Sequence, residues 1–344
     1  MKILRKRSAS RLILLFILCS ALVSLSEIGI VKASGTIYIR SDGSVDGTDK
    51  IQRDGNVYTF TANIYDPIVV ERDNIVVDGA GYSLQGTGSG KGIDLSDTNT
   101  VTIQNVEIKE FNDGIWLFES SNNTLIGNNI TANNQWGIRL AGSSNNTVSG
   151  NTITNNFVGV DFTASENNVV SGNHIANNND GIHLENLNNS IIWNTITNNN
   201  DKGIFLYSAG YNNIIGNNVT NNKRGILVSI CYNNVIYHNN FVNNTFQIEN
   251  DESNGIWDNG SEGNYWDDYT GVDADGDGIG DTPYVIDENN QDNYPLMSQW
   301  IPPTQHSEPF PITRVAAAIA IIAVVGVALM VYFAKFKKAT LKAE

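Results

Sequence analysis

The chain has little cysteine, with only two among 344 residues. Cys19 lies in an apolar run near the N-terminus, and Cys231 lies far downstream. If the N-terminal run is removed as a leader, Cys231 has no partner and no intramolecular disulfide can form. The mature protein must therefore be stabilised by the packing of its own chain.

Basic residues are also scarce: the sequence has 21 Lys and Arg against 36 Asp and Glu. Six of the basic residues precede Ser34 and five lie from Arg314 onward, which leaves 10 basic and 34 acidic residues between them, a net charge near −24. Such a field repels nucleic acids and other polyanions at long range and attracts divalent cations. The composition therefore argues against a nucleic-acid partner.

What the chain has in abundance is a repeat of Gly, an apolar residue, any residue and a second apolar residue. Its glycines recur every 22 or 23 residues, at Gly92, Gly114, Gly137, Gly159, Gly181, Gly203 and Gly225. A sustained period of this size predicts a solenoid, and the alternation predicts a strand after each glycine. Asn, Gly, Thr and Ile in such density have poor helix propensity, which excludes a helical repeat.

Two more apolar columns follow in each repeat, so we expect three short strands per coil. The first column is Ile103, Leu125, Val148, Val170, Ile192, Ile214 and Ile236, and the second is Ile108, Ile130, Ile153, Ile175, Ile196, Val219 and Phe241. An asparagine stands between them in nearly every coil, at Asn128, Asn151, Asn173, Asn194, Asn217 and Asn239. Asparagine tolerates left-handed backbone and its amide can bond to its copy one coil away, so we predict a structural ladder at this corner.

The ends of the chain predict its location. Lys2 to Arg11 precede an apolar run, and Val31 and Ala33 stand before a cleavage site at Ser34, which predicts a signal peptide over 1–33. The 20 uncharged residues 315–334 are long enough for a transmembrane helix, and the basic tail 335–344 is expected in the cytoplasm. We therefore predict a single-pass protein of the cell membrane with its repeats outside, joined by a Pro-rich linker over 298–314.

Several segments resemble a known family: IYIRSDGSV, DNIVVDGAGYSL, the NNTxxGNxIxNN repeats and the closing GNYWDDYTGVDADGDGIGDTPYVID. Together they resemble the periplasmic copper-binding NosD-type family, whose carbohydrate-binding and sugar-hydrolase repeats imply an all-β, right-handed parallel β-helix. The repeats then cover 91–245, between an N-terminal cap with the first coils over 34–90 and a C-terminal cap over 246–297.

The resemblance implies copper, but the chain departs from what copper requires. Its histidines, His174, His183, His238 and His306, are dispersed, and Cys231 and Met297 are the only soft ligands between the two predicted end segments. Copper favours imidazole and sulfur ligands. We therefore expect no copper as a cofactor, and a copper-handling role is kept only as a second alternative.

A calcium site is predicted in the C-terminal cap. The sequence DADGDGIGD places oxygen ligands at Asp273, Asp275, Asp277, the carbonyl of Ile279, and Asp281. Alternating oxygen ligands around a glycine are typical of a Ca²⁺ loop. Tyr284 occupies the place of the usual bidentate glutamate, so we expect either a weaker site or one that Asp287 or Glu288 completes. The alternative is an unliganded acidic turn.

Aromatic and aliphatic residues past the repeats are expected to cover the open end of the solenoid. They are Phe246, Ile248, Ile256, Trp257, Tyr265, Trp266, Tyr269 and Tyr284, of which Ile248 and Ile256 are aliphatic. For Trp257 and Trp266 a sugar-stacking platform is the alternative.

The outward residues of the first strand form the most varied face of the predicted solenoid. We expect ligand contacts at Trp116, Phe118, Trp136, Arg139, Asp161, His183, Phe205 and Tyr207. Aromatic rings stack on sugars and charged groups bond hydroxyls, so the expected partner is a polysaccharide or surface glycan. A solvated exterior with scattered aromatics is the alternative.

A catalytic interpretation of the same face groups Arg139, Asp161, Asp180, His183 and Glu185. Carboxylates on neighbouring coils would suit a hydrolase, and Arg139 with Asp161 would suit a lyase or epimerase. Because no conspicuous catalytic motif stands out, we expect a membrane-anchored surface protein that binds carbohydrate or envelope components. A polysaccharide-active enzyme, either a lyase, a hydrolase or an epimerase, is the alternative.

Overall fold

The computed structural model describes residues 35–302, and all of the regular structure in that range is strand. None of these residues forms a helix long and apolar enough to cross a membrane. The predicted signal peptide over 1–33, the transmembrane helix over 315–334 and the tail over 335–344 lie outside the described residues.

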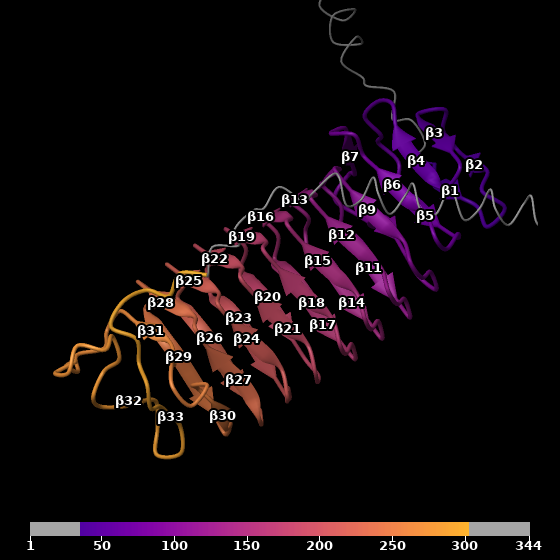
Figure 1. The fold of residues 1–344 in the computed structure, drawn as a ribbon. Coiled ribbons are helices and arrows are strands. Elements are labelled where there is room, and N and C mark those ends of the chain that lie inside the picture. The colour runs from indigo at the N-terminus through magenta and orange to yellow at the C-terminus, as the bar shows by residue number, and fades with distance from the viewer. Residues whose placement is uncertain (1–34, 303–344) are drawn as a thin grey trace, which may run out of the picture. The chain divides into compact units, whose positions relative to one another are not determined.

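The described residues form a right-handed parallel β-solenoid of about ten turns with about 22 residues per coil, as predicted. Each complete coil contributes one strand to each of three sheets, and successive coils stack along one axis (Figure 1). The three sheets hold 11, 11 and 9 strands.

Sheet 1 runs in the order β2-β1-β5-β8-β11-β14-β17-β20-β23-β26-β29. Its strands are β1 (Ile37–Ile39), β2 (Val45–Asp46), β5 (Ile68–Val70), β8 (Lys91–Asp94), β11 (Asp113–Phe118), β14 (Trp136–Ala141), β17 (Val158–Thr163), β20 (Asp180–Leu184), β23 (Lys202–Tyr207), β26 (Arg224–Ser229) and β29 (Phe246–Asp251).

Sheet 2 follows sheet 1 along each coil. Its strands are β3 (Ile51–Asp54), β4 (Val57–Phe60), β6 (Val76–Asp78), β9 (Thr102–Gln104), β12 (Thr124–Ile126), β15 (Thr147–Ser149), β18 (Val169–Ser171), β21 (Ser190–Ile192), β24 (Asn213–Ile215), β27 (Asn234–Tyr237) and β30 (Gly255–Ile256).

Sheet 3 completes each coil. Its strands are β7 (Ser83–Gln85), β10 (Glu107–Lys109), β13 (Asn129–Thr131), β16 (Thr152–Thr154), β19 (His174–Ala176), β22 (Thr195–Thr197), β25 (Asn218–Thr220), β28 (Asn240–Val242) and β31 (Tyr265–Trp266). An antiparallel pair, β32 (Tyr284–Val285) and β33 (Gln291–Asp292), stands apart from the three sheets.

The predicted apolar columns point inward and are buried, with one correction. In β21 the inward residue is Ile191, which pairs in register with Val170 and Ile214, whereas Ile192 is half-buried. The connection between sheets 1 and 2 is one residue shorter in this coil than in the coil before, which shifts the strand by one position. A shift of one residue turns each side chain to the other face of the sheet.

The repeated glycine of sheet 1 is required by close packing. A Cβ atom added at Gly181 would lie 2.5 Å from the carbonyl oxygen of Gly203 and 2.9 Å from the Ile196 side chain. Because the first of these neighbours is backbone, it cannot move aside without disturbing the next coil. Glycine at the start of each repeat therefore lets adjacent coils approach at this corner.

Asparagine ladders occupy all three corners of the solenoid, whereas the sequence analysis predicted one. The predicted ladder is present: the Asn173 amide donates to Asn194 Oδ1 at 2.9 Å, and the Asn194 amide donates to Asn217 Oδ1 at 3.0 Å. The two further ladders consist of Asn123, Asn146, Asn168, Asn189, Asn212 and Asn234, and of Asn133, Asn156, Asn178, Asn199, Asn222 and Asn244. All three are buried and saturate backbone groups at the bends.

The left-handed backbone expected at these asparagines falls instead one residue earlier. Trp193, with φ of 56°, precedes Asn194, and Asn177, with φ of 57°, precedes Asn178. Each ladder asparagine thus follows the bend and points its amide inward, where it bonds the coils on both sides.

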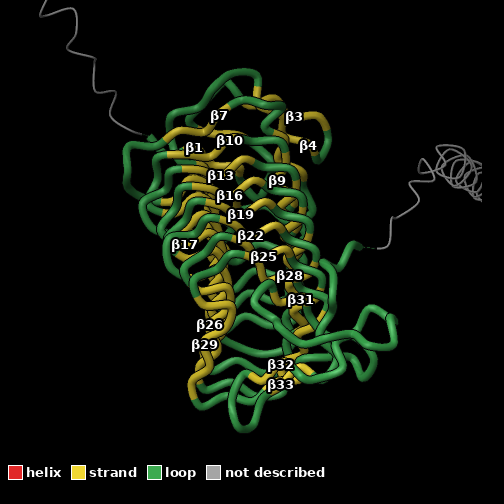
Figure 2. Tube along the Cα trace, turned by 90° about the vertical axis from the view of Figure 1, so that its left-hand side faces the viewer, coloured by secondary structure: helices red, strands yellow, loops and turns green. Residues whose placement is uncertain are grey.

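The C-terminal cap covers the last coil, and its loops lie beyond β29 in Figure 2. Trp266 is buried and stacks between Phe241, with ring centroids 4.5 Å apart, and Tyr284, at 4.3 Å. Trp257 is buried as well, so the alternative of sugar platforms at the two tryptophans is wrong. The cap prediction is wrong for Phe246 and Ile256, which are 53% and 49% exposed.

Candidate functional site

The varied outward face predicted from the sequence lies on sheet 1. Its centre is a row of residues in register on five adjacent strands, from β11 to β23, which we call the middle ladder: Trp116, Arg139, Asp161, His183 and Phe205. Adjacent strands are about 4.8 Å apart, so each side chain stands beside the next.

Asp161 is the polar centre of the middle ladder and is only 4% exposed. Its Oδ1 lies 2.9 Å from His183 Nδ1, and its Oδ2 lies 3.3 Å from Arg139 Nε. The Thr163 hydroxyl also donates to Oδ2 at 3.3 Å. A buried carboxylate needs such partners on both sides, and the coils before and after Asp161 supply them.

Aromatic rings enclose this polar centre at both ends. The Arg139 guanidinium carbon lies 3.8 Å from the Trp136 ring centroid and 5.0 Å from that of Trp116. At the other end the His183 ring stacks on Phe205, with centroids 4.9 Å apart and planes 10° from parallel. Cation–π and stacking contacts of this kind hold the side chains in fixed orientations.

The remaining aromatic candidates, Phe118 and Tyr207, lie one ladder further along the same face and are exposed. Tyr207 is close to Phe205, with ring centroids 6.0 Å apart. Sheet 1 therefore brings all eight predicted ligand-binding residues onto one outward face.

Of the five catalytic candidates, the structure groups four and separates one. Glu185 Oε1 lies 3.7 Å from His183 Nε2, which joins Glu185 to the Arg139, Asp161 and His183 cluster. Asp180 belongs to a neighbouring row, where the Lys202 ammonium binds it at 3.1 Å. The predicted grouping of Asp180 with Asp161 is therefore wrong, because a lysine on the next coil neutralises Asp180.

Asp113 is a residue on this face that the sequence analysis did not select. Burial raises the pKa of its carboxyl above the ordinary value, against the opposing effect of the Arg139 charge. The Asn112 side-chain amide donates a hydrogen bond to this carboxyl at 2.8 Å. The only sequence signal was an acidic residue directly before Gly114, next to a tryptophan on the following coil.

The arrangement orients His183 but does not expose its reactive nitrogen. When Nδ1 carries the proton and donates to Asp161, Nε2 is the free acceptor, as in an Asp–His pair used for acid–base chemistry. However, Nε2 is buried and has no hydrogen-bond partner. A substrate reaches this nitrogen only if Glu185 or the ring moves.

The predicted calcium loop places three carboxylates together. Oxygen atoms of Asp273, Asp275 and Asp277 lie within 4.8 Å of one another. Asp273 accepts from the backbone N–H of Gly278 at 2.9 Å, and this bond, with two more from the loop, lowers the pKa of the Asp273 carboxyl. Asp281 lies outside the group of three.

The loop is joined to the end of the described chain. The Gly280 N–H donates to Pro295 O at 2.8 Å, and the Met297 N–H donates to Gly278 O at 3.0 Å. The Asp281 carboxylate accepts from the Ala274 N–H at 2.8 Å, across the loop. An ion held here would tie these segments to one another.

Asp287, expected to complete the calcium site, lies elsewhere. It accepts two bonds from the Asn290 amide, at 2.9 and 3.0 Å, and another from Asn250. Asn290 in turn accepts from Trp257 Nε1 at 3.3 Å. The expectation is therefore wrong for Asp287, whose bonds connect the end of sheet 1 to the cap.

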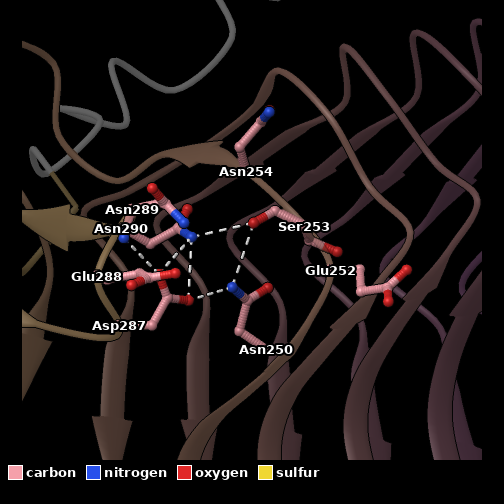
Figure 3. A pocket seen from close by; sticks show the side chains of 8 residues that line it. All are labelled: Asn250, Glu252, Ser253, Asn254, Asp287, Glu288, Asn289 and Asn290. Carbon is pink, nitrogen blue, oxygen red and sulfur yellow. Dashed lines mark hydrogen bonds between the residues drawn. The ribbon is translucent and has the colours of Figure 1, made fainter.

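These residues belong to an open pocket of about 670 Å³, which the sequence analysis did not predict. Figure 3 shows its lining: Asn250, Glu252, Ser253, Asn254, Asp287, Glu288, Asn289 and Asn290. Glu288 lines this pocket too and does not join the three aspartates. Because Asn250, Asp287, Asn290 and the Ser253 carbonyl bond one another, the pocket is first of all a joint between coil and cap.

The family model described as periplasmic copper-binding protein (NosD) matches residues 66–271. The chain belongs to the NosD family. None of the curated proteins matches this NosD-family chain.

Several solved structures are similar to the chain at low sequence identity. The Dettilon tailspike protein (gp208) is 14% identical with a TM-score of 0.51, over 65% of this chain and 50% of the tailspike. The periplasmic alginate epimerase AlgG is 17% identical with a TM-score of 0.45, over 60% and 69%. An alginate lyase from Paenibacillus sp. str. FPU-7 is 13% identical with a TM-score of 0.37, over 56% and 94%. These similarities concern the fold alone.

The donors of this NosD-family protein do not form a copper site within residues 35–302. His174 lies on sheet 3 and His183 on sheet 1, while His238 Nε2 lies 2.7 Å from Glu262. The buried Cys231 thiol faces backbone carbonyls. In this range, the three loop aspartates form the only group of three or more His, Cys, Asp or Glu side chains whose ligand atoms all lie within 4.8 Å of one another, and their hard oxygen ligands suit calcium rather than copper. His306 lies outside the described residues.

Proposed function

We propose that this protein binds an extended carbohydrate chain on the outward face of sheet 1, and that the rest of the solenoid is its scaffold. The observation that carries the proposal is the middle ladder, in which Trp116 and Phe205 enclose an ordered polar centre at Asp161. Sugar rings present apolar C–H faces and hydroxyl edges, and this row offers a partner for each.

The length of the row also supports an extended ligand. Five adjacent strands give a strip about 19 Å long at the ordinary strand spacing. The outward positions of sheet 3 from β13 to β25 are mostly Thr and Asn and include no aromatic ring larger than His174. The contrast favours sheet 1 as the recognition surface.

The predicted ends of the chain place this surface outside the cell. We propose that the signal peptide over 1–33 exports the chain and that the helix over 315–334 anchors it in the membrane. The periplasmic description of the family supports an extracytoplasmic position. The ligand would then be a polysaccharide or glycan of the cell envelope.

Calcium is proposed as the structural cofactor of the cap, held by Asp273, Asp275 and Asp277. The support is the proximity of their carboxylates, within 4.8 Å of one another, and the attachment of the loop to Pro295 and Met297. The ion would stabilise the C-terminal end and take no part in recognition.

A binding experiment tests the main proposal. The purified full-length protein is screened on a glycan array, and the strongest ligand is titrated into the Trp116→Ala variant. Loss of one stacking ring should weaken binding about tenfold, which corresponds to about 1.4 kcal/mol. The matched control is Tyr82→Ala, which removes an exposed ring outside sheet 1. Equal loss in both variants, or no bound glycan, contradicts the proposal.

A second candidate is catalysis by the same face, favoured by the Asp161 to His183 bond. Asp161 would orient His183, and His183 would act as the general base. The test is release of reducing ends or unsaturated uronates from the bound glycan, compared between wild type and His183→Asn. Binding without turnover in the wild type contradicts this candidate and leaves the first intact.

A further inference from the structure

Every cation on the outward face of sheet 1 is already paired with a carboxylate. Among the described residues of this face, Lys91 pairs with Asp94 at 2.8 Å, and Arg139 pairs with Asp161 at 3.3 Å. Lys202 pairs with Asp180 at 3.1 Å and with Asp201 at 3.0 Å. Arg224 pairs with Asp201 at 2.6 Å and also with Glu249. A ligand carboxylate arriving here would compete with a fixed protein carboxylate for each cation.

Three of these cations are also committed to aromatic rings. Lys91 Nζ lies 4.5 Å from the Trp116 ring centroid, and Lys202 Nζ lies 5.1 Å from that of Phe205. The Arg139 guanidinium carbon lies 3.8 Å from the centroid of Trp136. Their positive charge therefore serves to position the rings and to neutralise aspartates of the protein itself.

A carboxylate without such neutralisation remains on the same face. Glu185 is close to the ring of His183 rather than to a lysine or arginine. Around it, residues 34–313 carry 34 acidic and 10 basic side chains. Local and long-range fields thus both oppose an anionic ligand.

We infer that the ligand of this face is a neutral, hydroxyl-rich glycan and that polyuronates are excluded from it. This inference rests on the proposed carbohydrate binding and specifies the class of carbohydrate. Carboxylates only accept hydrogen bonds, so a face rich in them is complementary to sugar hydroxyls, which donate. A uronate replaces one of those hydroxyls with another acceptor that carries charge.

The test compares polymers that differ only in their carboxylates. Polygalacturonate, polyglucuronate and polymannuronate are each titrated into the full-length protein beside their own carboxyl-reduced products, at low and at high salt. We expect at least one reduced polymer to bind at least about tenfold more tightly than its acidic parent, with little dependence on salt.

Two variants with the same change in total charge localise the effect. Glu185→Gln removes an acidic group from the sheet 1 face, and Glu107→Gln removes one from sheet 3. We expect Glu185→Gln to lower the ratio of the two affinities, reduced polymer over acidic parent, about threefold or more. Glu107→Gln should leave this ratio unchanged. Equal narrowing in both variants would assign the preference to net charge and overturn the assignment to this face.

The outcomes separate a failure of this inference from a failure of the proposed carbohydrate binding. If an acidic parent binds more tightly than its reduced product and salt weakens that binding, the inference is wrong and carbohydrate binding stands. If none of the polymers and none of their reduced products binds, both are wrong.

Discussion

The corner ladders and the middle ladder of sheet 1 both stack one residue per coil in register, but the corner ladders repeat one residue type and the middle ladder does not. At each corner asparagine returns in successive coils, and each asparagine bonds its copy, as Asn194 does with Asn173 and Asn217. In the middle ladder the residue changes at each coil, from tryptophan through arginine, aspartate and histidine to phenylalanine. Repetition marks positions that the coil itself needs, and variation marks positions free to serve a ligand.

The largest expected effect comes from breaking a corner ladder at Asn194. Its amide donates to Val170 O at 2.9 Å and to Asn217, and its Oδ1 accepts from the Asn173 N–H at 3.0 Å. Asn194→Ala leaves buried backbone groups without partners, at about 1 to 3 kcal/mol each. We expect the free energy of unfolding to fall by about 3 kcal/mol or more in urea titrations.

The control for that variant is Thr195→Ala, an exposed outward position of the same coil, which should change stability by less than about 0.5 kcal/mol. Similar losses in the two variants would show that the ladder has no special role.

The next largest effect is a dependence of stability on pH. It arises at the C-terminal end of the predicted ladder, where Asn264 hydrogen-bonds to Asp292 instead of to another asparagine. The Asn264 N–H and Trp266 Nε1–H donate to Asp292 Oδ2 at 2.7 and 2.9 Å. Burial raises the pKa of Asp292 from 3.8 to about 6. The folded state therefore binds this proton more tightly than the unfolded state.

Stability from this group should fall as pH rises from about 4 through about 6 and level off above that, by about 3 kcal/mol in all. Urea midpoints across this range, compared between wild type and Asp292→Asn, measure the effect. The stability of Asp292→Asn should not fall in this way between about pH 4 and 6. If the variant shows the same pH dependence as the wild type, Asp292 is not the group responsible.

Calcium is expected to change the stability of the protein by a comparable amount. The experiment asks whether the C-terminal cap needs a bound ion for its stability, whereas the coils are stabilised by their own hydrogen bonds. A ligand at 100 times its dissociation constant stabilises the folded state by about 2.7 kcal/mol. Chelation should lower the melting temperature of the wild type but not of Asp275→Asn. A wild-type melting temperature that is the same with and without chelator would count against the site.

The smallest expected effect lies in the middle ladder. Phe205→Leu keeps an apolar side chain at a half-buried outward position, so the free energy of unfolding should change by less than about 1 kcal/mol. Glycan affinity should fall while thermal unfolding is nearly unchanged. A loss of stability as large as that of Asn194→Ala would erase the distinction between the two kinds of ladder.

The repeats predicted the solenoid because an identical residue every 22 positions occupies the same place in each coil. The same signal was present for the two further ladders, for example at Asn168 and Asn178, but the abundance of asparagine obscured their registers. The inward residue of β21 was misplaced because Ile191 and Ile192 are adjacent, and no pattern of polarity shows a connection shortened by one residue.

The sequence predicted which outward face carries the candidate site, but it did not predict which side chains on that face pair with one another. Register places Asp161 beside Arg139 and His183, so their proximity followed from the period. That Lys202 takes Asp180, or that Asp113 is buried, depends on side-chain positions across coils, which spacing does not determine. The bonds of Asp287 to Asn250 and Asn290 depend in the same way on how the cap folds back.

The most direct test of the central claim uses the six tryptophans as reporters. Trp116 and Trp136 lie on the sheet 1 face, whereas Trp257 and Trp266 are buried in the cap and Trp193 and Trp300 lie elsewhere. The protein is labelled with fluorotryptophan, its resonances are assigned by single substitutions, and the bound glycan is titrated while fluorine NMR spectra are recorded. The account predicts that the Trp116 and Trp136 resonances shift and the other four do not. Shifts at Trp193 or Trp300 with Trp116 and Trp136 unmoved would contradict it.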